Sequence, residues 1–476
     1  MNQYYILKPK NLNLEHLVNK YTPNFNFNID FAHFIFHLMI IYQNENTEDS
    51  ITRLSSKFLQ KMNRNYNLHI DFLLENFPCN GSVLKGNRYS VNKPFGYRFS
   101  NYYNTNEFEI YTIIDKVLVP KIKKIFSIKI NENLRLQYYF LLKHFKKDKL
   151  TASQPSILMN EINALPDKKK RIRNAKNIIK IMNGEYSCTL KPKTDGRVHS
   201  NITRLSKISR KYLQHNGEYL AEVDISSAVP FILFLTMKMH LDNNLSYLAS
   251  NFQYSNTITY MLDEVTGDVD KSELRDFGTS VISGSLYEQF SNLILNEKLY
   301  TDKGYKFEKV VAYYNYSFKK QFGYNFDGDK SDLKKFAKKR MLSMIFAKST
   351  SYTFEQIVFK ELYPSILKFI NEFKNVEQYK DDESTKIAPK DKHKKLAYFC
   401  FQFEAKMMID KIAREFDKIH NGKIPIYSLH DCIITTNSNV EMLNVFMQNK
   451  FIEMFGIAPN LTIEKSHLNI VHNIAS

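Results

Sequence analysis

The sequence predicts an α+β fold, because its strand signals fall into two blocks with a long helical stretch between them. Short apolar runs and turn residues mark the first block at about residues 186–235 and the second at 396–476. From 236 to about 395 the pattern is helical and charged. A doubly wound sheet would instead alternate strands and helices along the whole chain.

Length and charge narrow the class of protein. The 476-residue chain is too long for one small core, so two or three subdomains are expected. The formal charge of +18 and the pI near 9.3 favour a polyanionic partner, either nucleic acid or an acidic membrane surface. The alternative is compositional bias of an AT-rich genome, since Asn, Lys, Ile, Phe and Tyr are abundant, Gly is scarce at 14 and Trp is absent.

Cysteine usage and hydropathy indicate a reducing compartment and no membrane. The cysteines at 79, 188, 400 and 432 form no Cys-x-x-Cys pair, so neither a disulfide framework nor a zinc site is predicted. The first residues lack the plan of a signal peptide. No run of about eighteen apolar residues is present, so no membrane span is expected. A cytoplasmic protein is predicted, and its oligomeric state is left open.

Residues 1–185 are predicted to be mostly helical and carry no chemical motif. Residues 31–42 form an apolar helix or strand in which His33 and His37 stand one helical turn apart. A metal pair is one interpretation, but packing in the core explains them better. Basic residues interleave with aromatics at 138–147 and cluster at 168–173. Such runs are typical of solvated faces, and they would also suit the phosphates of a nucleic acid backbone.

The remaining elements follow from periodicity and turn signals. In the first block, the apolar strand that starts at Tyr219 ends on Asp224. The helical stretch after it is interrupted at 254–266, 323–332 and 380–395. The second block is predicted as a helix (Ala397–His420), a hairpin (Ile424–Thr436), a helix (Asn439–Phe455) and a strand (Asn460–Lys465).

Two aspartates are the strongest candidates for chemistry. Asp224 leaves the end of an apolar strand, where burial of a carboxylate without a cation would be costly. Asp431 lies with His430 at the tip of the predicted hairpin, exposed on both sides. An aspartate in a turn can also serve simply to cap the backbone. If the two carboxylates meet in space, they form a magnesium site of the kind that drives phosphoryl transfer.

A lysine-rich helix is predicted between the two aspartates, at 334–347. Lys334 and Lys338 fall one turn apart on one face, and Phe346 lies two turns beyond Lys338 on that face. A cationic stripe that ends in an aromatic could hold a triphosphate and stack on a base. The alternative is an ordinary solvated helix face.

The order of these segments resembles a known family. Gly196-Arg197, followed by Asn201, Arg210 and Gly217, is similar to the Gly-Arg segment of family A DNA polymerases and phage-type single-subunit RNA polymerases. Val223-Asp-Ile-Ser-Ser resembles their motif A, the helix at 334–347 resembles motif B, and Leu429-His-Asp-Cys-Ile-Ile resembles motif C. The resemblance covers about residues 190–476 and rests on the motifs in this order.

The resemblance implies a right-hand polymerase with an antiparallel palm sheet and largely helical fingers and thumb. Four segments are expected: the N-terminal region and thumb (1–185), the first palm part with motif A (186–235), the fingers with the motif B helix at about 331–348 (236–395), and the second palm part with motif C (396–476). The N-terminal part shows no Asp-x-Glu pair of a proofreading exonuclease. It is also too short for the promoter-binding domain of phage RNA polymerases.

The resemblance also implies roles for individual residues. Asp224, Asp431 and the Ile225 carbonyl would bind two Mg²⁺ ions, with Mn²⁺ as a substitute, and Lys338 would contact the phosphates and protonate the leaving pyrophosphate. The implied nucleotide-binding residues are Ser226, Val229, Lys334, Lys338, Lys339, Arg340 and Phe346, and those implied for the primer and template are Arg197, Gln402 and His430. Lys339 with Ala347 is an alternative register, and Arg340 is close enough to share the role of Lys338.

Three departures from the family leave sugar selection open. Val229 stands where DNA polymerases carry a glutamate that excludes ribose, and Cys432 stands where they usually carry a second motif C acid. Phe346 replaces the common tyrosine, and Ala347 replaces the glycine after it. A valine can still exclude a 2′-hydroxyl by bulk, so DNA synthesis is favoured.

The leading hypothesis is a template-directed DNA polymerase of a phage, plasmid or other mobile element, acting on a primer–template and nucleoside triphosphates. The alternatives are an RNA polymerase or primase-like enzyme, a template-independent nucleotidyltransferase, and a palm that binds nucleic acid without catalysis. A reverse transcriptase is disfavoured because the turn reads His-Asp and no Tyr-x-Asp-Asp-like doublet is present. The template, the primer requirement and the host are not indicated.

Overall fold

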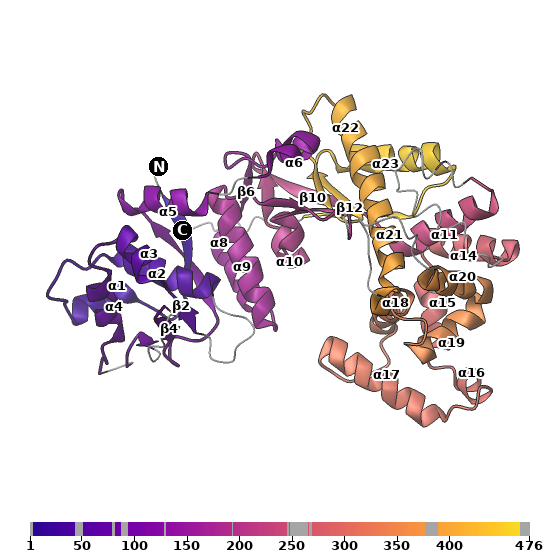
Figure 1. Ribbon diagram of the computed structural model, residues 1–476, viewed down its shortest axis with the longest axis horizontal. Coiled ribbons are helices and arrows are strands. Elements are labelled where there is room, and N and C mark those ends of the chain that lie inside the picture. Colours follow the sequence, from indigo (N-terminus) through magenta and orange to yellow (C-terminus); the bar gives the residue numbers. More distant parts are fainter. Residues whose placement is uncertain are drawn as a thin grey trace, which may run out of the picture. The chain divides into compact units, whose positions relative to one another are not determined.

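The computed structural model has helices and antiparallel strands throughout, so the chain is α+β (Figure 1). It describes residues 3–42, 51–78, 81–86, 94–127, 130–192, 194–244, 247, 265, 269–376 and 389–466. The chain divides into two compact units. Unit 1 comprises Met1–Thr189, His199–Ala221 and Lys465–Ser476, and unit 2 comprises Leu190–Val198 and Glu222–Glu464. The four-segment division into palm, fingers and thumb stays a prediction.

Unit 1 mixes strands and helices. Its strands are β1 (Tyr4–Pro9), β2 (Thr52–Arg53), β3 (Leu84–Gly86), β4 (Gly96–Phe99), β5 (Phe108–Ile113), β6 (Leu150–Ala152) and β9 (Leu213–His215). Its helices are α1 (Leu14–Lys20), α2 (Ile29–Ile41), α3 (Ser56–Met62), α4 (Tyr66–Leu74), α5 (Leu118–Phe126), α6 (Glu132–Gln137), α7 (Tyr139–Leu142), α8 (Pro155–Asn163), α9 (Lys168–Asn183), η1 (Ile202–Arg204) and α10 (Lys207–Arg210). Strands β7 (Cys188–Leu190) and β8 (Val198–Ser200) lie where the chain passes from one unit to the other.

The prediction that residues 1–185 are mostly helical was therefore incomplete. Strand β1 pairs antiparallel with β5, from Tyr4 opposite Ile113 to Pro9 opposite Phe108, and β4 lies between β2 and β3. These strands are short, and their partners lie far along the chain. Their apolar residues do not alternate clearly with polar ones, so local periodicity does not reveal them.

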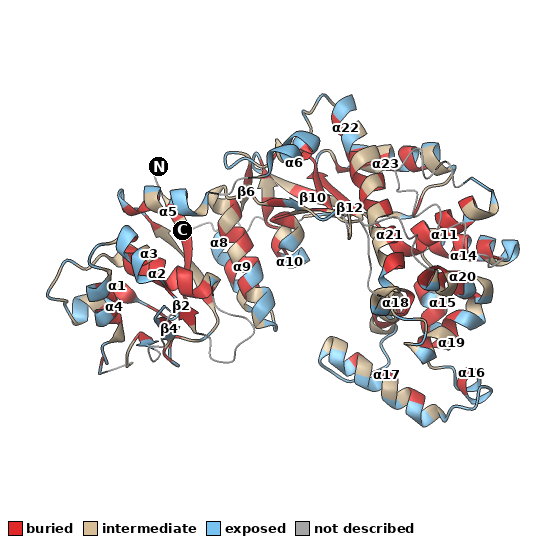
Figure 2. Cartoon of the chain, in the orientation of Figure 1, coloured by how far each residue is buried: buried red, intermediate tan, exposed pale blue. Residues whose placement is uncertain are grey.

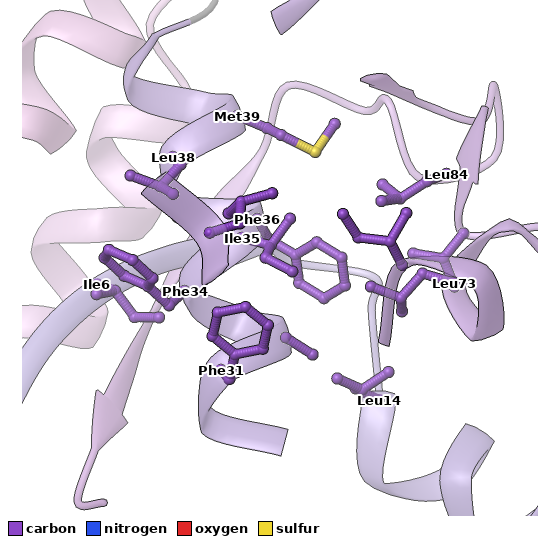
Figure 3. Packing of buried hydrophobic residues seen from close by; sticks show 14 of the residues in the cluster. Ile6, Leu14, Phe31, Phe34, Ile35, Phe36, Leu38, Met39, Leu73 and Leu84 are labelled. Atoms are coloured by element: carbon purple, nitrogen blue, oxygen red, sulfur yellow. The ribbon is translucent and has the colours of Figure 1, made fainter. Parts of the chain in front are cut away.

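The core of unit 1 is built around α2, which is buried from Phe31 to Ile40 (Figure 3). Apolar side chains of β1, α1 and α4 pack against this helix, as Ile6, Leu14 and Leu73 show in Figure 3. His33 and His37 belong to the same core, at 0% and 3% exposure. His37 Nδ1 accepts a hydrogen bond of 3.1 Å from the Leu7 amide, which gives this histidine a role in packing.

Unit 2 consists of a small sheet and a large set of helices. Its strands are the second half of β10 (Glu218–Ile225), β11 (Tyr427–Leu429), β12 (Cys432–Thr436) and β13 (Leu461–Lys465). Its helices are α11 (Ala228–Leu241), α14 (Lys271–Ser283), α15 (Leu286–Leu293), α16 (Glu297–Thr301), α17 (Phe307–Phe322), α18 (Lys330–Phe346), α19 (Thr353–Leu362), α20 (Pro364–Asn375), η3 (Pro389–Asp391), α21 (Lys394–Ala405), the π-helical η4 (Lys406–Ala413), α22 (Arg414–Ile419) and α23 (Val440–Phe455).

The structure confirms the predicted order of helix, hairpin, helix and strand at the C-terminal end of the chain. The helix expected at Ala397–His420 is continuous from α21 through η4 to α22, and its middle turns are π-helical. The interruption expected at 323–332 is present, since α17 ends at Phe322 and α18 begins at Lys330. The interruptions expected at 254–266 and 380–395 lie largely outside the described residues.

Strand β10 occupies the centre of the unit 2 sheet, with β12 on one side and β13 on the other. Helix α11 follows β10 directly and is buried along almost its whole length, as Figure 2 shows. Helix α21 packs against both α11 and α18, and η4 packs against the hairpin. The strand end that carries Asp224 is thus held in a well-packed frame.

Within the described residues, no helix has the length and apolarity required to span a bilayer.

Candidate active site

The two candidate aspartates meet at one end of the unit 2 sheet. Asp224 lies next to the end of β10, and Asp431 lies in the two-residue turn between β11 and β12, where Leu429 pairs with Cys432. The Ile225 amide donates a hydrogen bond of 3.2 Å to the backbone carbonyl of Asp431. This bond brings the end of β10, which carries Asp224, beside the turn that carries Asp431.

The hairpin turn depends on His430. This residue has φ +58°, in the left-handed region that two-residue hairpin turns use. Asp431 follows it and is half-buried, whereas the sequence led us to expect a fully exposed tip. The difference arises because β12 pairs with β10, so the turn lies against another strand instead of projecting into solvent.

Both carboxylates are in an environment that disfavours their charge. Burial, followed by the nearby Asp431, raises the pKa of Asp224 to about 7, and Glu222 and Glu464 act in the same direction. Burial also raises the pKa of Asp431, against the opposing effect of Arg197 and Lys338. Two neighbouring carboxylates with raised pKa values are the arrangement that a bound divalent cation would stabilise.

The donor set fits a magnesium ion, which prefers oxygen ligands. Asp224 and Asp431 supply carboxylates, and the Ile225 carbonyl lies on the same strand end. Ser226 Oγ is buried and has no hydrogen-bond partner among the described residues, so it is a further oxygen that an ion or its water could satisfy. The described residues contain no group of three or more His, Cys, Asp or Glu side chains arranged to hold a metal. Any ion here would therefore keep several water or substrate ligands.

Helix α18 presents Lys338 to this strand end. Its Nζ lies 3.5 Å from the Ser226 carbonyl and 5.3 Å from the centre of the Tyr287 ring on α15. Lys334, one turn earlier, pairs with Glu288 of α15 at 3.4 Å. The two lysines therefore share one face of α18, as their spacing predicted.

The sequence did not predict that Tyr287 lies at the site. It is 5% exposed, it is hydrogen-bonded to Ser227, and burial and Asp431 raise its pKa. Since a tyrosine on a helix that carries no motif gives no local signal, only the packing of α15 against α18 reveals it.

Arg340 points elsewhere, which corrects the expectation that it could share the role of Lys338. Its guanidinium forms an ion pair of 2.5 Å with the buried Glu355, donates to the Tyr313 hydroxyl, and lies 4.7 Å from the centre of the Tyr352 ring. Two residues along an α-helix differ by about 200° in direction, so Arg340 and Lys338 face opposite sides. Arg340 anchors α18 to its neighbours. Lys339 is exposed.

Arg197 and Phe346 are joined through α21. The Arg197 guanidinium lies 4.2 Å from the centre of the Phe401 ring. The centres of the Phe346 and Phe401 rings are 5.3 Å apart, in an edge-to-face arrangement. Arg197 also makes a two-pronged ion pair with Glu404, with Nε–Oε1 and Nη2–Oε2 distances of 2.8 Å. The arginine is thereby fixed in direction by a charge and by an aromatic face.

Glu404 is a second residue that sequence reasoning missed. It is 1% exposed, and burial raises its pKa to about 8, with Asp431 and Asp224 acting in the same direction against the effect of Arg197. An available signal was its position on the apolar side of α21, next to Phe403. A carboxylate on a buried helix face requires a partner.

Gln402 holds the loop that carries Arg197. Its side-chain nitrogen donates to the carbonyls of Thr194 at 3.2 Å and Pro192 at 3.4 Å. Gly196 has φ +62°, and a Cβ there would lie 3.4 Å from Gln402 Cα. The glycine therefore permits both the turn and the close approach.

Val229 and Cys432, the two positions that bear on sugar selection, are both buried, at 9% and 2% exposure. Val229 lies in the first turn of α11, and Cys432 begins β12. The site as a whole is that of two carboxylates, an exposed lysine and an anchored arginine around one end of a sheet.

No family model matches the chain, and no curated protein is similar to it in sequence.

Proposed function

We propose that this chain is a template-directed DNA polymerase with a right-hand fold similar to that of family A, and that it extends a primer 3′-end by transfer of a nucleotidyl group. The observation that carries the proposal is the meeting of Asp224 and Asp431, joined by the Ile225–Asp431 backbone bond, with Lys338 Nζ at the adjacent Ser226 carbonyl. Strand-borne carboxylate pairs with a cationic side chain nearby are the arrangement that phosphoryl transfer uses.

The reaction would form a bond between the primer 3′-oxygen and the α-phosphorus and break the bond from that phosphorus to pyrophosphate. The residues that would hold Mg²⁺ are Asp224, Asp431 and the Ile225 carbonyl, and the ion supplies Lewis-acid stabilisation of the phosphoryl oxygens when bound. Lys338 is exposed, so its ammonium group is free to contact the triphosphate and to donate a proton to the departing pyrophosphate. Lys334, on the same face, adds positive charge along the path of the phosphates.

In this proposal Arg197, held by Glu404 and Phe401, contacts the nucleic acid. Its guanidinium is held by Glu404 and Phe401, so it keeps one direction when a primer end approaches. Phe346 stands at the end of α18, half-buried, with its ring against Phe401. An aromatic in this position can pack on an incoming base or sugar.

Primer extension tests the proposal. A labelled primer on a DNA template is incubated with magnesium and either dNTPs or rNTPs, with and without template, for the native chain and for Asp431→Asn. Asp302→Asn is the matched control, because Asp302 is an exposed acid of unit 2 and the charge change is the same. Templated extension with dNTPs, lost in Asp431→Asn and kept in Asp302→Asn, is the expected result.

The other outcomes separate the alternatives. Extension with rNTPs, or synthesis without a primer, would replace the proposal by an RNA polymerase or primase. Untemplated tails would indicate a nucleotidyltransferase. Absence of any product, together with salt-sensitive DNA binding, would leave a non-catalytic palm.

A further inference from the structure

Unit 1 carries a basic groove along α9 that the proposed active site does not use. The groove has a volume of about 440 Å³. Its cationic lining residues are Lys169, Lys170, Arg173, Lys176, Lys180 and Arg204. We call this feature the α9 groove. Among its described lining residues these six cations stand against one carboxylate, Asp167.

Four cations of the α9 groove are exposed, whereas Lys176 Nζ donates a hydrogen bond of 3.1 Å to the Ile41 carbonyl. Lys169, Lys170, Arg173 and Arg204 are exposed, and none of them forms an ion pair with another residue that the structure describes. The one carboxylate, Asp167, caps the helix by accepting hydrogen bonds from the backbone amides of Lys169 and Lys170 at 2.8 and 3.3 Å. The Asp167 carboxylate is thus bound to the backbone at the start of the helix.

The cations also crowd one another. Burial lowers the pKa of Lys180, and the neighbouring Lys176 and Arg204 lower it further. The first turn of α9 contains no acid beyond the N-cap Asp167, although acidic residues stabilise that end of a helix and cations destabilise it. The stability of the helix therefore does not account for the cations of its first turn.

The arrangement has the form of a row. Lys169, Arg173, Lys176 and Lys180 follow one another at intervals of three or four residues, so they lie on one face of α9. At 1.5 Å per residue the row is about 16 Å long. A polyanion with regularly spaced charges matches such a row, whereas a single small anion would engage only part of it.

We propose that the α9 groove binds the phosphodiester backbone of a nucleic acid strand without reading its bases. The described residues that line the groove include no aromatic side chain on which a base could stack, and the one aliphatic side chain among them, Ile172, is only 4% exposed. An anionic membrane surface fits less well, because interfacial binding needs exposed apolar side chains beside the cations. Binding in unit 1 does not depend on the catalytic function proposed for unit 2.

The test measures binding as a function of salt. The full chain carrying Asp431→Asn is titrated against a fluorescein-labelled oligothymidylate at several KCl concentrations, with and without Lys169→Gln/Lys170→Gln/Arg173→Gln. Loss of three phosphate contacts reduces the slope of log K against log[salt] by about 2, which corresponds to about a hundredfold weaker binding at 0.1 M salt if the two lines converge at 1 M. An oligodeoxyadenylate should behave in the same way, since no base is read.

The control removes the same charge from another face of unit 1. Lys57, Lys61 and Arg64 are exposed residues in and just after α3, and Lys57→Gln/Lys61→Gln/Arg64→Gln should leave the slope unchanged. The groove variant should unfold at the same or a higher temperature than the parent, because it removes cations from a helix N-terminus. A comparison of the two variants therefore separates the groove from net charge and from misfolding.

Three results would overturn the proposal. The slope could stay at the parent value in the groove variant, or it could fall equally in the control variant. Alternatively, the groove variant could lose binding to phosphatidylserine vesicles while it keeps its affinity for both oligonucleotides, which would assign the groove to a membrane surface. Because every protein in the test is catalytically impaired by design, failure of the polymerase proposal would not affect these results.

Discussion

Three buried histidines of unit 1 and two buried acids of unit 2 respond to burial in opposite ways. In unit 1, burial lowers the pKa of His37 to about 3, of His144 to about 3 and of His215 to about 4. At the candidate site of unit 2, burial raises the pKa of Asp224 to about 7 and that of Glu404 to about 8. The histidines are neutral at physiological pH, whereas the acids are left partly charged and close together.

This difference separates burial for packing from burial for function. A neutral imidazole can fill a core and accept a hydrogen bond, as His37 does from the Leu7 amide, without a counterion. A pair of carboxylates at a strand end and a hairpin turn is not needed for packing, and it requires a cation for charge balance. Unit 1 instead carries a concentration of exposed charge in the α9 groove.

The largest expected effect comes from removing either carboxylate of the pair in unit 2. Asp224→Asn and Asp431→Asn should each lower the rate of primer extension by at least about a thousandfold, because the transition state loses a ligand of its stabilising cation. The same variants should raise the unfolding temperature in EDTA, because one of two like charges is gone. Single-turnover kinetics and calorimetry measure the two effects. If the extension rate and the unfolding temperature both fall, while Asp302→Asn changes neither, the aspartates serve stability.

The second prediction compares the two faces of α18. Arg340→Ala should destabilise unit 2 by about 3–5 kcal/mol, because it leaves the buried Glu355 without its partner. Lys338→Ala should leave stability unchanged and slow extension by about 10²- to 10⁴-fold. Chemical denaturation and extension rates distinguish them, and Lys330→Ala, on an exposed position at the start of the same helix, should change neither. Equal effects of the three substitutions would contradict the assignment of faces.

The third prediction concerns pH. The unfolded chain binds more protons than unit 1 between the folded pKa of His37, about 3, and its ordinary value of 6.5, so the free energy of unfolding falls as pH falls through this window. The acids of unit 2 act in the opposite sense. Folded Asp224 binds more protons than the unfolded chain between pH 3.8 and about 7, so its contribution to stability falls as pH rises.

Hydrogen exchange in EDTA at several pH values resolves the two units. Peptides from β1 and α2 should lose at least about 3 kcal/mol of protection between pH 6.5 and 4, whereas peptides around β10 and the hairpin should gain protection at the more acidic pH. His37→Gln should reduce the acid sensitivity, and His16→Gln, at an exposed position, is its control. Parallel pH profiles in both units would refute the contrast.

The smallest expected effect lies in the loop that carries Arg197. Gly196→Ala should cost about 1–2 kcal/mol from the left-handed backbone, and its Cβ would approach Gln402 Cα at 3.4 Å. Gly217→Ala has a similar backbone conformation, with φ +81°, but open space around the added Cβ. Primer affinity, measured with both variants, should fall only for Gly196→Ala. If both weaken primer binding equally, the contact with Gln402 has no part in it.

What the sequence established by itself was local. The apolar strand before Asp224, the hairpin at Asp431, the lysine spacing of α18 and the helices around the hairpin all follow from periodicity and turn residues, which act within a few positions of the chain. The α+β class followed from their order. The strands of residues 1–185 were missed because each is short and is stabilised by a distant partner.

Only the tertiary structure decided which side chains face one another. It placed Asp431 half-buried against β10, turned Arg340 towards Glu355, and brought Tyr287 and Glu404 to the site. A helix or strand has two faces, and the sequence of one element does not state which neighbour each face will meet. Packing decides that, because burial of a charged or hydroxyl group is tolerated only where another element supplies its partner.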